Sequence, residues 1–282
     1  MSTNPKGDPE MTDLSKIYMP ITADPFEKSD SYTEIMPSAP LRPYIRCFWG
    51  SLRPVGPSPD KPSGIVIPDT CMDIIFHFYE WGSTSFFCHI DETAHCPSGN
   101  SDTAEYSTFA VRFYPWSAAA FAEYPDMSVP TDRPEELFPK LTRRLYEAVS
   151  RETTLTGRSQ AAEAVLCEFL CPENQSTDVM NALYLTINSN GNIKISDLAA
   201  YTALSPRTLQ RKFSVQTGIS PKALCELVRY QLLWQETAMG KGISILDAVE
   251  KYGYYDQSHL LGDFRKRHLM TPAEAVKYLH RR

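Results

Sequence analysis

The sequence lacks long apolar runs and also lacks the short motifs that mark common enzymes. No segment approaches the roughly 18 apolar residues of a membrane helix, and the N-terminal residues have no signal-peptide core. There is no glycine-rich phosphate loop, no G-x-S-x-G, no H-E-x-x-H and no string of clustered His and Glu ligands. We therefore expect a cytoplasmic protein that is not an enzyme and needs no cofactor.

The seven cysteines are odd in number and irregularly spaced, which predicts reduced thiols instead of a disulfide framework. The one cluster with metal-ligand chemistry is Cys88, His89, His95 and Cys96. Its spacing matches no standard zinc module, and adjacent residues of a strand point to opposite faces. We therefore expect no metal site, and a metal- or thiol-responsive regulator is kept as an alternative.

Charge divides the chain into two unlike parts, although the net charge of the 282 residues is −6. Residues 176–282 contain 14 Lys and Arg against 9 Asp and Glu, whereas residues 1–175 contain 14 against 25. Only the C-terminal part is electrostatically suited to a phosphate backbone. The acidic N-terminal part suits a sensing, partner-binding or oligomerisation role.

One helix-turn-helix pattern occurs twice between Ile195 and Pro272, about 50 residues apart. In each copy a polar N-cap precedes two core residues spaced four apart, and a proline then opens the next helix. The equivalent residues are Ser205, Leu209, Phe213 and Pro221 in the first copy and Asp256, Leu260, Phe264 and Pro272 in the second. The second helix of each copy should therefore present its other face to solvent.

The outward faces carry residue types that recognise base edges and phosphates in a major groove. The candidate DNA-binding residues are Ser205, Pro206, Arg207, Gln210, Arg211, Gln257, Ser258, His259, Arg265 and Lys266. Residues 221–239 predict one helix of roughly 28 Å between the copies. This spacing would place two recognition helices near one turn of DNA apart, about 34 Å.

The phrases LSPRTLQRKFSVQTGISP and GYYDQSHLLGDFRKRHLMTPAEAVKY resemble the AraC family of transcription regulators, over about residues 178–278. The resemblance implies that Arg207, Gln210 and Arg211, with residues 257–259, contact promoter DNA. It also implies an activator-type regulator on the bacterial nucleoid, with RNA polymerase and a second copy of the chain as candidate partners. Gly262 departs from the family, which commonly has an arginine or another polar residue there. The second motif would then act mainly as a backbone clamp.

The N-terminal part predicts a different class of structure. Residues 1–30 are polar and aperiodic and predict a disordered tail. Five strand patterns lie between residues 32 and 115, followed by helices at 117–124, 133–150 and 157–170. We expect an α+β protein, with a β-rich effector-binding or dimerisation domain at 31–172 and an AraC-type DNA-binding domain at 173–282.

Three N-terminal phrases, APLRPYIRCFWG, IVIPDTCMDIIFHF and FAVRFYPWSAAAF, resemble the sensor domain of one branch of AraC-type regulators. The resemblance implies a small cupin-like β-barrel with a helical dimerisation appendage. Thr70 and Trp116 each replace a glycine that is usual in this branch, so both turns should be shaped differently here.

Five residues are candidates for binding an unknown small-molecule effector. Asp69 and Asp73 flank a turn into an apolar strand and Arg112 lies within another, so a carboxylate–guanidinium pair inside the barrel could orient a polar ligand. Phe76 and Trp116 could line the same pocket. The alternatives are a structural salt bridge or an exposed turn for the charged residues and ordinary core packing for the rings.

The whole pattern predicts a sequence-specific DNA-binding transcription regulator controlled by a small-molecule effector. An AraC-shaped adaptor that binds protein instead of DNA is the alternative, with Gly262 as its first sign. A plain helical bundle would need two coincidental motifs. A DNA-repair alkyl acceptor would need four grouped cysteines, which Cys47, Cys71, Cys88 and Cys96 are not.

Overall fold

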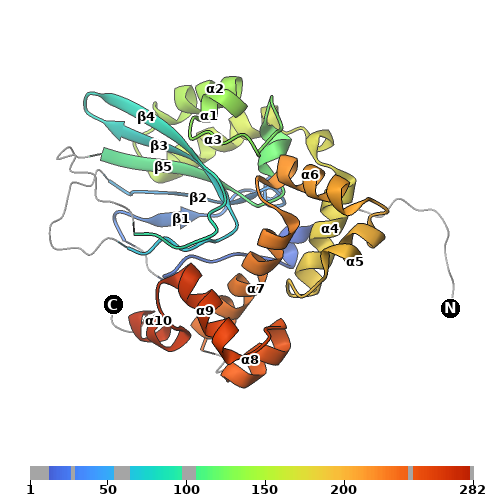
Figure 1. Cartoon of the computed structure of the whole chain (residues 1–282). Helices are drawn as coiled ribbons and strands as arrows, with labels where there is room; N and C mark the ends of the chain where they lie inside the picture. Colours follow the sequence, from blue (N-terminus) through green and yellow to red (C-terminus); the bar gives the residue numbers. More distant parts are fainter. Residues whose placement is uncertain (1–12, 27–28, 54–63, 97–105, 241–243, 280–282) are drawn as a thin grey trace.

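The computed structural model describes residues 13–26, 29–53, 64–96, 106–240 and 244–279. An antiparallel sheet forms the N-terminal half, and helices build the C-terminal half beside it (Figure 1). The expected α+β class is confirmed.

The sheet contains β1 (Thr33–Ile35), β2 (Ile45–Gly50), β3 (Met72–Tyr79), β4 (Gly82–Cys88) and β5 (Tyr106–Phe113). Its order is β1-β2-β5-β3-β4, with every neighbouring pair antiparallel. β1 and β4 are the two edges. The described strands therefore form one open sheet where a small barrel or sandwich was expected.

The two faces of the sheet differ because successive strand residues alternate in direction. Ile74, Phe76 and Phe109 lie on a buried apolar face, each at most 1% exposed. Helices α1 (Pro134–Leu137), α2 (Pro139–Val149) and α3 (Leu155–Phe169) cover this face (Figure 1). The opposite face carries Asp73 directly across from Arg112.

The C-terminal half consists of helices joined by short turns. They are α4 (Thr177–Asn188), α5 (Ile195–Tyr201), α6 (Pro206–Thr217), α7 (Pro221–Ala238), α8 (Ile245–Tyr252), α9 (Gln257–His268) and α10 (Pro272–Leu279). Short 3-10 helices occur at Leu14–Lys16, Ala118–Phe121 and Pro172–Asn174. The predicted duplication is present: α5 and α6 form one motif, α8 and α9 form the other, and α7 lies between them.

The caps and core residues of both motifs are as the spacing predicted. Ser205 accepts a hydrogen bond from the backbone N–H of Thr208, and Asp256 accepts one from His259 at 2.7 Å. These bonds satisfy donors that a helix start leaves unpaired. The four core residues of the two stripes are fully buried: Leu209, Phe213, Leu260 and Phe264.

Residues 13–26 are part of the packed structure and not the disordered tail that their polar composition predicted. Leu14 and Tyr18 are each 2% exposed. Gln231 of α7, which is fully buried, accepts from the Ile21 N–H at 2.9 Å and donates to the Ile21 carbonyl at 3.0 Å. Helix α7 supplies the hydrogen bonds that this segment cannot make for itself. Residues 1–12 lie outside the described residues.

The two halves of the chain contact each other at several places. The Met127 N–H donates to the Val215 carbonyl at 2.7 Å, and Gln216 donates to the Trp116 carbonyl at 3.3 Å. The segment expected to link the domains is itself attached, since Gln175 also donates to Trp116. Packed contacts therefore cross the expected boundary at 172/173. The boundary itself stays a prediction.

Replacing Gln231 with Ala should destabilise the protein, because it leaves buried backbone groups of Ile21 and Pro68 without partners. We expect the free energy of unfolding in urea to fall by about 1 to 3 kcal/mol. The control is Gln235→Ala, which removes a single hydrogen bond, to Met19, in a more exposed position. Equal effects for both variants would show that burial of Gln231 contributes nothing.

Candidate functional site

The outward face of α6 is free of covering structure among the described residues. Arg207, Gln210 and Arg211 are exposed, and they line a surface hollow together with Thr208 and Ser214. The buried stripe of Leu209 and Phe213 fixes the opposite face. The first motif therefore presents two guanidinium groups and an amide together, as groove recognition requires.

Helix α9 presents a second exposed set. Gln257, Ser258 and His259 lie exposed in its first turn, as do Arg265 and Lys266 further along. Gly262 is also exposed, and a Cβ built there meets nothing within 4 Å. The exposed face of α9 resembles a DNA-recognition face, but it carries no side chain at its centre.

Tyr255 is a candidate contact residue that the motif comparison did not select. Its side chain is 90% exposed, directly before the N-cap of α9. Its backbone N–H donates to Nδ1 of His259 at 3.3 Å. An isolated tyrosine in a turn gives no sequence signal, because only the fold shows that nothing described covers it.

The last turn of α9 is divided between surface and core. Arg267 is 1% exposed and forms ion pairs with Asp263 and with Glu226 of α7. Asp263 also accepts from the Tyr254 hydroxyl at 2.9 Å. Fully buried His268 shares a 2.7 Å hydrogen bond with the Tyr230 hydroxyl. These contacts attach α9 to α7 and hold its outward face in one orientation.

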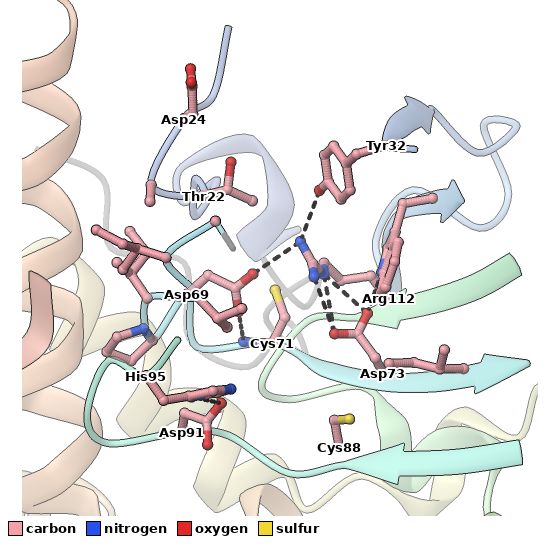
Figure 2. A pocket seen from close by; sticks show the side chains of 18 of the residues that line it. Thr22, Asp24, Tyr32, Asp69, Cys71, Asp73, Cys88, Asp91, His95 and Arg112 are labelled. Atoms are coloured by element: carbon pink, nitrogen blue, oxygen red, sulfur yellow. Dashed lines mark hydrogen bonds and ion pairs between the residues drawn. The ribbon is translucent and has the colours of Figure 1, made fainter. Parts of the chain in front are cut away.

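A cavity of about 860 Å³ lies between the sheet and the C-terminal helices. Figure 2 shows charged side chains from several segments pointing into it. Its walls come from the polar sheet face, from residues 22–24 and 29–32, from residues 64–71 and 88–95, and from Tyr278 of α10. Helix α10, which follows the second helix-turn-helix motif, thus contributes a residue to this cavity.

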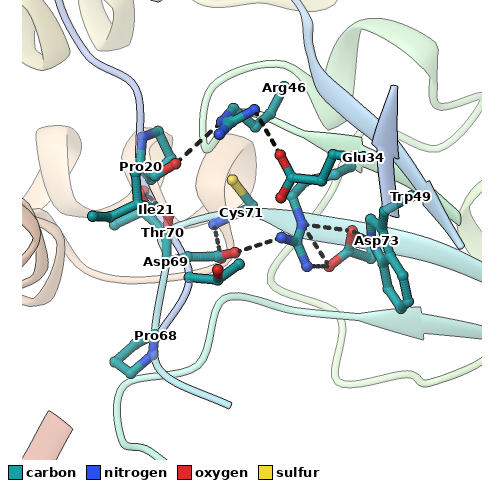
Figure 3. Close-up of polar contacts among 12 residues, drawn as sticks. Pro20, Ile21, Glu34, Arg46, Trp49, Pro68, Asp69, Thr70, Cys71 and Asp73 are labelled. Carbon is teal, nitrogen blue, oxygen red and sulfur yellow. Dashed lines mark hydrogen bonds and ion pairs between the residues drawn. The ribbon is translucent and has the colours of Figure 1, made fainter. Parts of the chain in front are cut away.

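Arg112 is the centre of the cavity's polar wall (Figure 2), and its partners Asp69 and Asp73 are also seen in Figure 3. Its Nε lies 3.0 Å from Oδ1 of Asp73, and its Nη1 lies 3.0 Å from Oδ2 of Asp69. Trp49 donates to Asp73 at 2.8 Å, and the guanidinium lies 5.4 Å from the Trp49 ring centroid. The predicted carboxylate–guanidinium pair is present, and a second carboxylate joins it.

The electrostatics of this group follow from burial and pairing. Burial raises the pKa of Asp73, while the Arg112 guanidinium acts in the opposite direction. Burial disfavours the charge of Arg112, but Asp69 and Asp73 hold its pKa well above the ordinary value. Arg112 therefore carries its charge at every accessible pH.

The turn before β3 holds Asp69 in place. Thr70 has φ of +64°, a left-handed conformation that favours glycine, which explains why glycine is usual there. Its Oγ1 lies 3.0 Å from the Tyr18 hydroxyl and donates to the Asp69 carbonyl at 2.6 Å. The threonine thus uses its hydroxyl to keep a backbone shape that glycine adopts without strain.

Two of the five predicted effector residues do not reach the cavity. Phe76 lies on the buried face of β3, whereas Asp73 and Ile75 lie on the opposite face of the strand. Trp116 is 2% exposed, stacks on Tyr114 and donates to the Pro43 carbonyl at 2.9 Å. Both rings belong to the core, so their assignment to the pocket was wrong.

Other wall residues come from segments with no shared sequence pattern. Tyr32 precedes β1, and Tyr278 lies in the last turn of α10, nearly the whole chain apart. Trp49 faces the cavity from β2. Only the tertiary structure brings these side chains together.

The described residues contain no group of three or more His, Cys, Asp or Glu side chains placed to hold a metal ion. His89 instead contacts the Thr131 carbonyl through Nε2 at 2.9 Å, and His95 lies 3.8 Å from Asp91. The structure therefore gives no support to a metal shell from Cys88, His89, His95 and Cys96.

Two family models match separate parts of the chain. Residues 198–278 match the family model of a helix-turn-helix domain. The chain carries an AraC-type helix-turn-helix domain. Residues 33–133 match a domain of unknown function (DUF6597), which covers the sheet. The AraC-type domain thus includes both motifs from α5 to α10.

Among curated proteins, the chain is similar to an uncharacterized HTH-type transcriptional regulator, YbfI, of Bacillus subtilis. The two are 29% identical over 130 residues, which is 45% of this chain and 41% of that protein. The similarity therefore spans about two fifths of the relative's length.

Solved structures with similarity include AraC-type proteins. A probable AraC family transcriptional regulator from Rhodopseudomonas palustris is 25% identical over 37% of this chain and 98% of its own, with a TM-score of 0.33. An apo variant of ToxT from Vibrio cholerae is 12% identical over 82% and 97%, with a TM-score of 0.40. Within the described ranges of our chain, every helix is too short or too polar to cross a membrane.

The buried His268 should make stability depend on pH. Burial lowers its pKa to about 3, so protonation favours the unfolded chain, whose imidazole titrates near pH 6.5. The stability that neutral His268 gives is complete above that pH and is lost as the pH falls below it. Between pH 7 and pH 5 we expect a loss of about 2 kcal/mol.

Urea denaturation at the two pH values measures this loss. His268→Gln should make the pH dependence smaller, because the variant side chain does not titrate. The exposed His259→Gln should keep the parent's pH dependence. If His268→Gln loses as much stability on acidification as the parent, His268 is not the responsible group.

Proposed function

We propose that the protein is a sequence-specific DNA-binding transcription regulator in which both motifs contact one duplex. One observation carries this proposal. Helices α6 and α9 each have an exposed face, and helix α7 lies between the two motifs. Arg207, Gln210 and Arg211 would read bases from α6, with Ser205 and Pro206 at its start. Gln257, Ser258, His259, Arg265 and Lys266 would bind mainly the backbone from α9.

The length and attachment of α7 support this arrangement. Its 18 residues span roughly 27 Å, close to the 34 Å that separates successive major grooves on one face of DNA. The contacts of Glu226 with Arg267 and of Tyr230 with His268 attach α9 to this helix. A rigid spacer lets both recognition helices bind without a separate cost for aligning them.

We propose further that a small molecule in the cavity sets DNA affinity. The sheet supplies Asp73 and Arg112 to this cavity, and α10 supplies Tyr278. Residues 22–24 also line it, directly beside the segment hydrogen-bonded to α7. A ligand that touches both halves can favour one arrangement, provided that it binds the two arrangements unequally. The same proposal includes RNA polymerase and a second copy of the chain as partners. It also includes a cytoplasmic location.

A protein-binding adaptor is the second candidate, and the surface of the second motif favours it. Leu246 is 67% exposed on α8, Tyr255 is 90% exposed, and Gly262 provides no reading side chain on α9. Exposed apolar and aromatic side chains such as Leu246 and Tyr255 are typical of protein contacts. Gel-shift measurements against random duplexes distinguish the two functions, since an adaptor would select no sequence.

Arg211→Ala should weaken binding to a duplex selected by the protein by about 1 to 3 kcal/mol, because a bidentate base contact is lost. Quantitative gel shift on the selected site and on scrambled duplexes measures the change. Arg144→Ala removes an exposed arginine paired with Glu168 on the N-terminal half and should change neither. An equal loss on every duplex would assign Arg211 to a phosphate instead.

Gly262→Arg should strengthen DNA binding. The position is exposed, open and helical, and replacing glycine there also improves helix propensity by about 1 kcal/mol. We expect tighter binding with a steeper dependence on salt, because an added cation releases further counterions. Unchanged affinity for all duplexes at low salt would show that the centre of α9 does not face DNA.

A further inference from the structure

We propose that the cavity binds an organic cation, an amine or amidine on an apolar body, with Asp91 as its counter-ion. This inference rests on the proposed function only in treating the cavity as the effector site. It names the chemical class of a ligand that neither the family models nor the relatives assign.

Negatively charged groups outnumber positively charged groups along the described wall of the cavity. Among the described residues, the carboxylates of Asp69, Asp73 and Asp91 line it against one guanidinium, that of Arg112. Asp24 also lines it, and it interacts with another group. His89 and His95 add positive charge only when protonated. Above neutral pH the described wall therefore has an excess of negative charge, which favours entry of a cation over entry of an anion.

Arg112 is not available to an acidic ligand. Its Nε and Nη2 contact Asp73 at 3.0 and 3.2 Å, and its Nη1 contacts Asp69 at 3.0 Å. A carboxylate or phosphate ligand would have to displace one of these aspartates, and the displaced aspartate would stay charged in a wall where Asp73 is only about 10% exposed. Leaving such a group without its partner is strongly unfavourable.

Asp91 is the carboxylate best placed to receive a cation. Its ion-pair partner, His95, lies 3.8 Å away, and both side chains are about half exposed. Burial is the main cause that raises the pKa of Asp91, so its negative charge is incompletely balanced by what surrounds it. In Figure 2 Asp91 and His95 lie on the opposite side of the cavity from the Arg112 group. A cation at Asp91 would leave the Arg112 pairs intact.

The rest of the wall suits the body of such a ligand. Ile65, Val66, Ile67 and Pro68 form an apolar strip along one side. The rings of Tyr32 and Trp49 lie 5.5 Å apart beside Arg112 and add apolar surface for the body of the ligand. A volume of about 860 Å³ is in the range of sites that enclose whole small molecules.

A matched series of three probes tests the charge preference on the full chain. Titration calorimetry at pH 8 would compare 4-phenylbutylamine, 4-phenylbutan-1-ol and 4-phenylbutanoate, which differ only in their terminal group. We expect saturable binding in the order amine, alcohol, carboxylate, with the amine at least about tenfold tighter than the carboxylate. A carboxylate that binds as tightly as the amine, or no binding by the amine, overturns the proposal.

A variant pair locates the counter-ion. Asp91→Asn should weaken the amine about threefold, the size of a partly exposed charge pair, and leave the alcohol unchanged. Glu92→Gln removes the neighbouring exposed carboxylate, which does not line the cavity, and should leave both affinities unchanged. Retained alcohol binding shows that the variant is folded. An amine that binds Asp91→Asn and the parent equally refutes the role of Asp91.

Gel shift on the selected duplex, with and without the amine, separates this inference from the proposed function. Amine binding by a chain that selects no duplex supports the ligand class and refutes the DNA-binding regulator. Selective DNA binding by a chain that ignores the amine supports the regulator and refutes the ligand class. A change in DNA affinity with the amine at saturation supports both.

Discussion

The packing of helix α7 is the constraint on which the rest of the structure depends. Its fully buried Gln231 bonds to Ile21 and to the Pro68 carbonyl, so one side chain joins α7 to two segments of the N-terminal half. Its residues Glu226 and Tyr230 attach to α9. Because buried polar groups lose much of their stabilisation when a partner is removed, these bonds favour one joint arrangement of both halves.

This arrangement explains how a site in the sheet can be connected with recognition helices elsewhere. The cavity is not enclosed by the sheet alone, since Tyr278 of α10 and residues 22–24 complete its walls. A molecule placed there would contact α10 and the segment held by α7 at the same time. Coupling between ligand and DNA then needs only unequal affinity for two packings of the same surfaces.

The ion pairs of the cavity wall bear on its structure and on the ligand recognition that we propose for it. Asp69, Asp73 and Arg112 satisfy each other, so the wall is stable when empty of ligand. The same pairing removes Arg112 as an anion site and leaves an excess of carboxylates. The proposed preference for a cation therefore depends on which charged groups are already paired with each other. It does not depend simply on which charged groups line the cavity.

The sequence by itself determined the elements with strong local signals: the two motifs, their caps at Ser205 and Asp256, and the α7 spacer. Local signals suffice there because a cap acts on the next three residues and a helical stripe repeats every turn. It also identified Asp73 and Arg112 as partners. Tertiary structure alone decided that Phe76 and Trp116 are core, that residues 13–26 pack on α7, and that Tyr278 reaches the cavity. Those outcomes depend on contacts between distant segments, whose partners no local pattern of residues specifies.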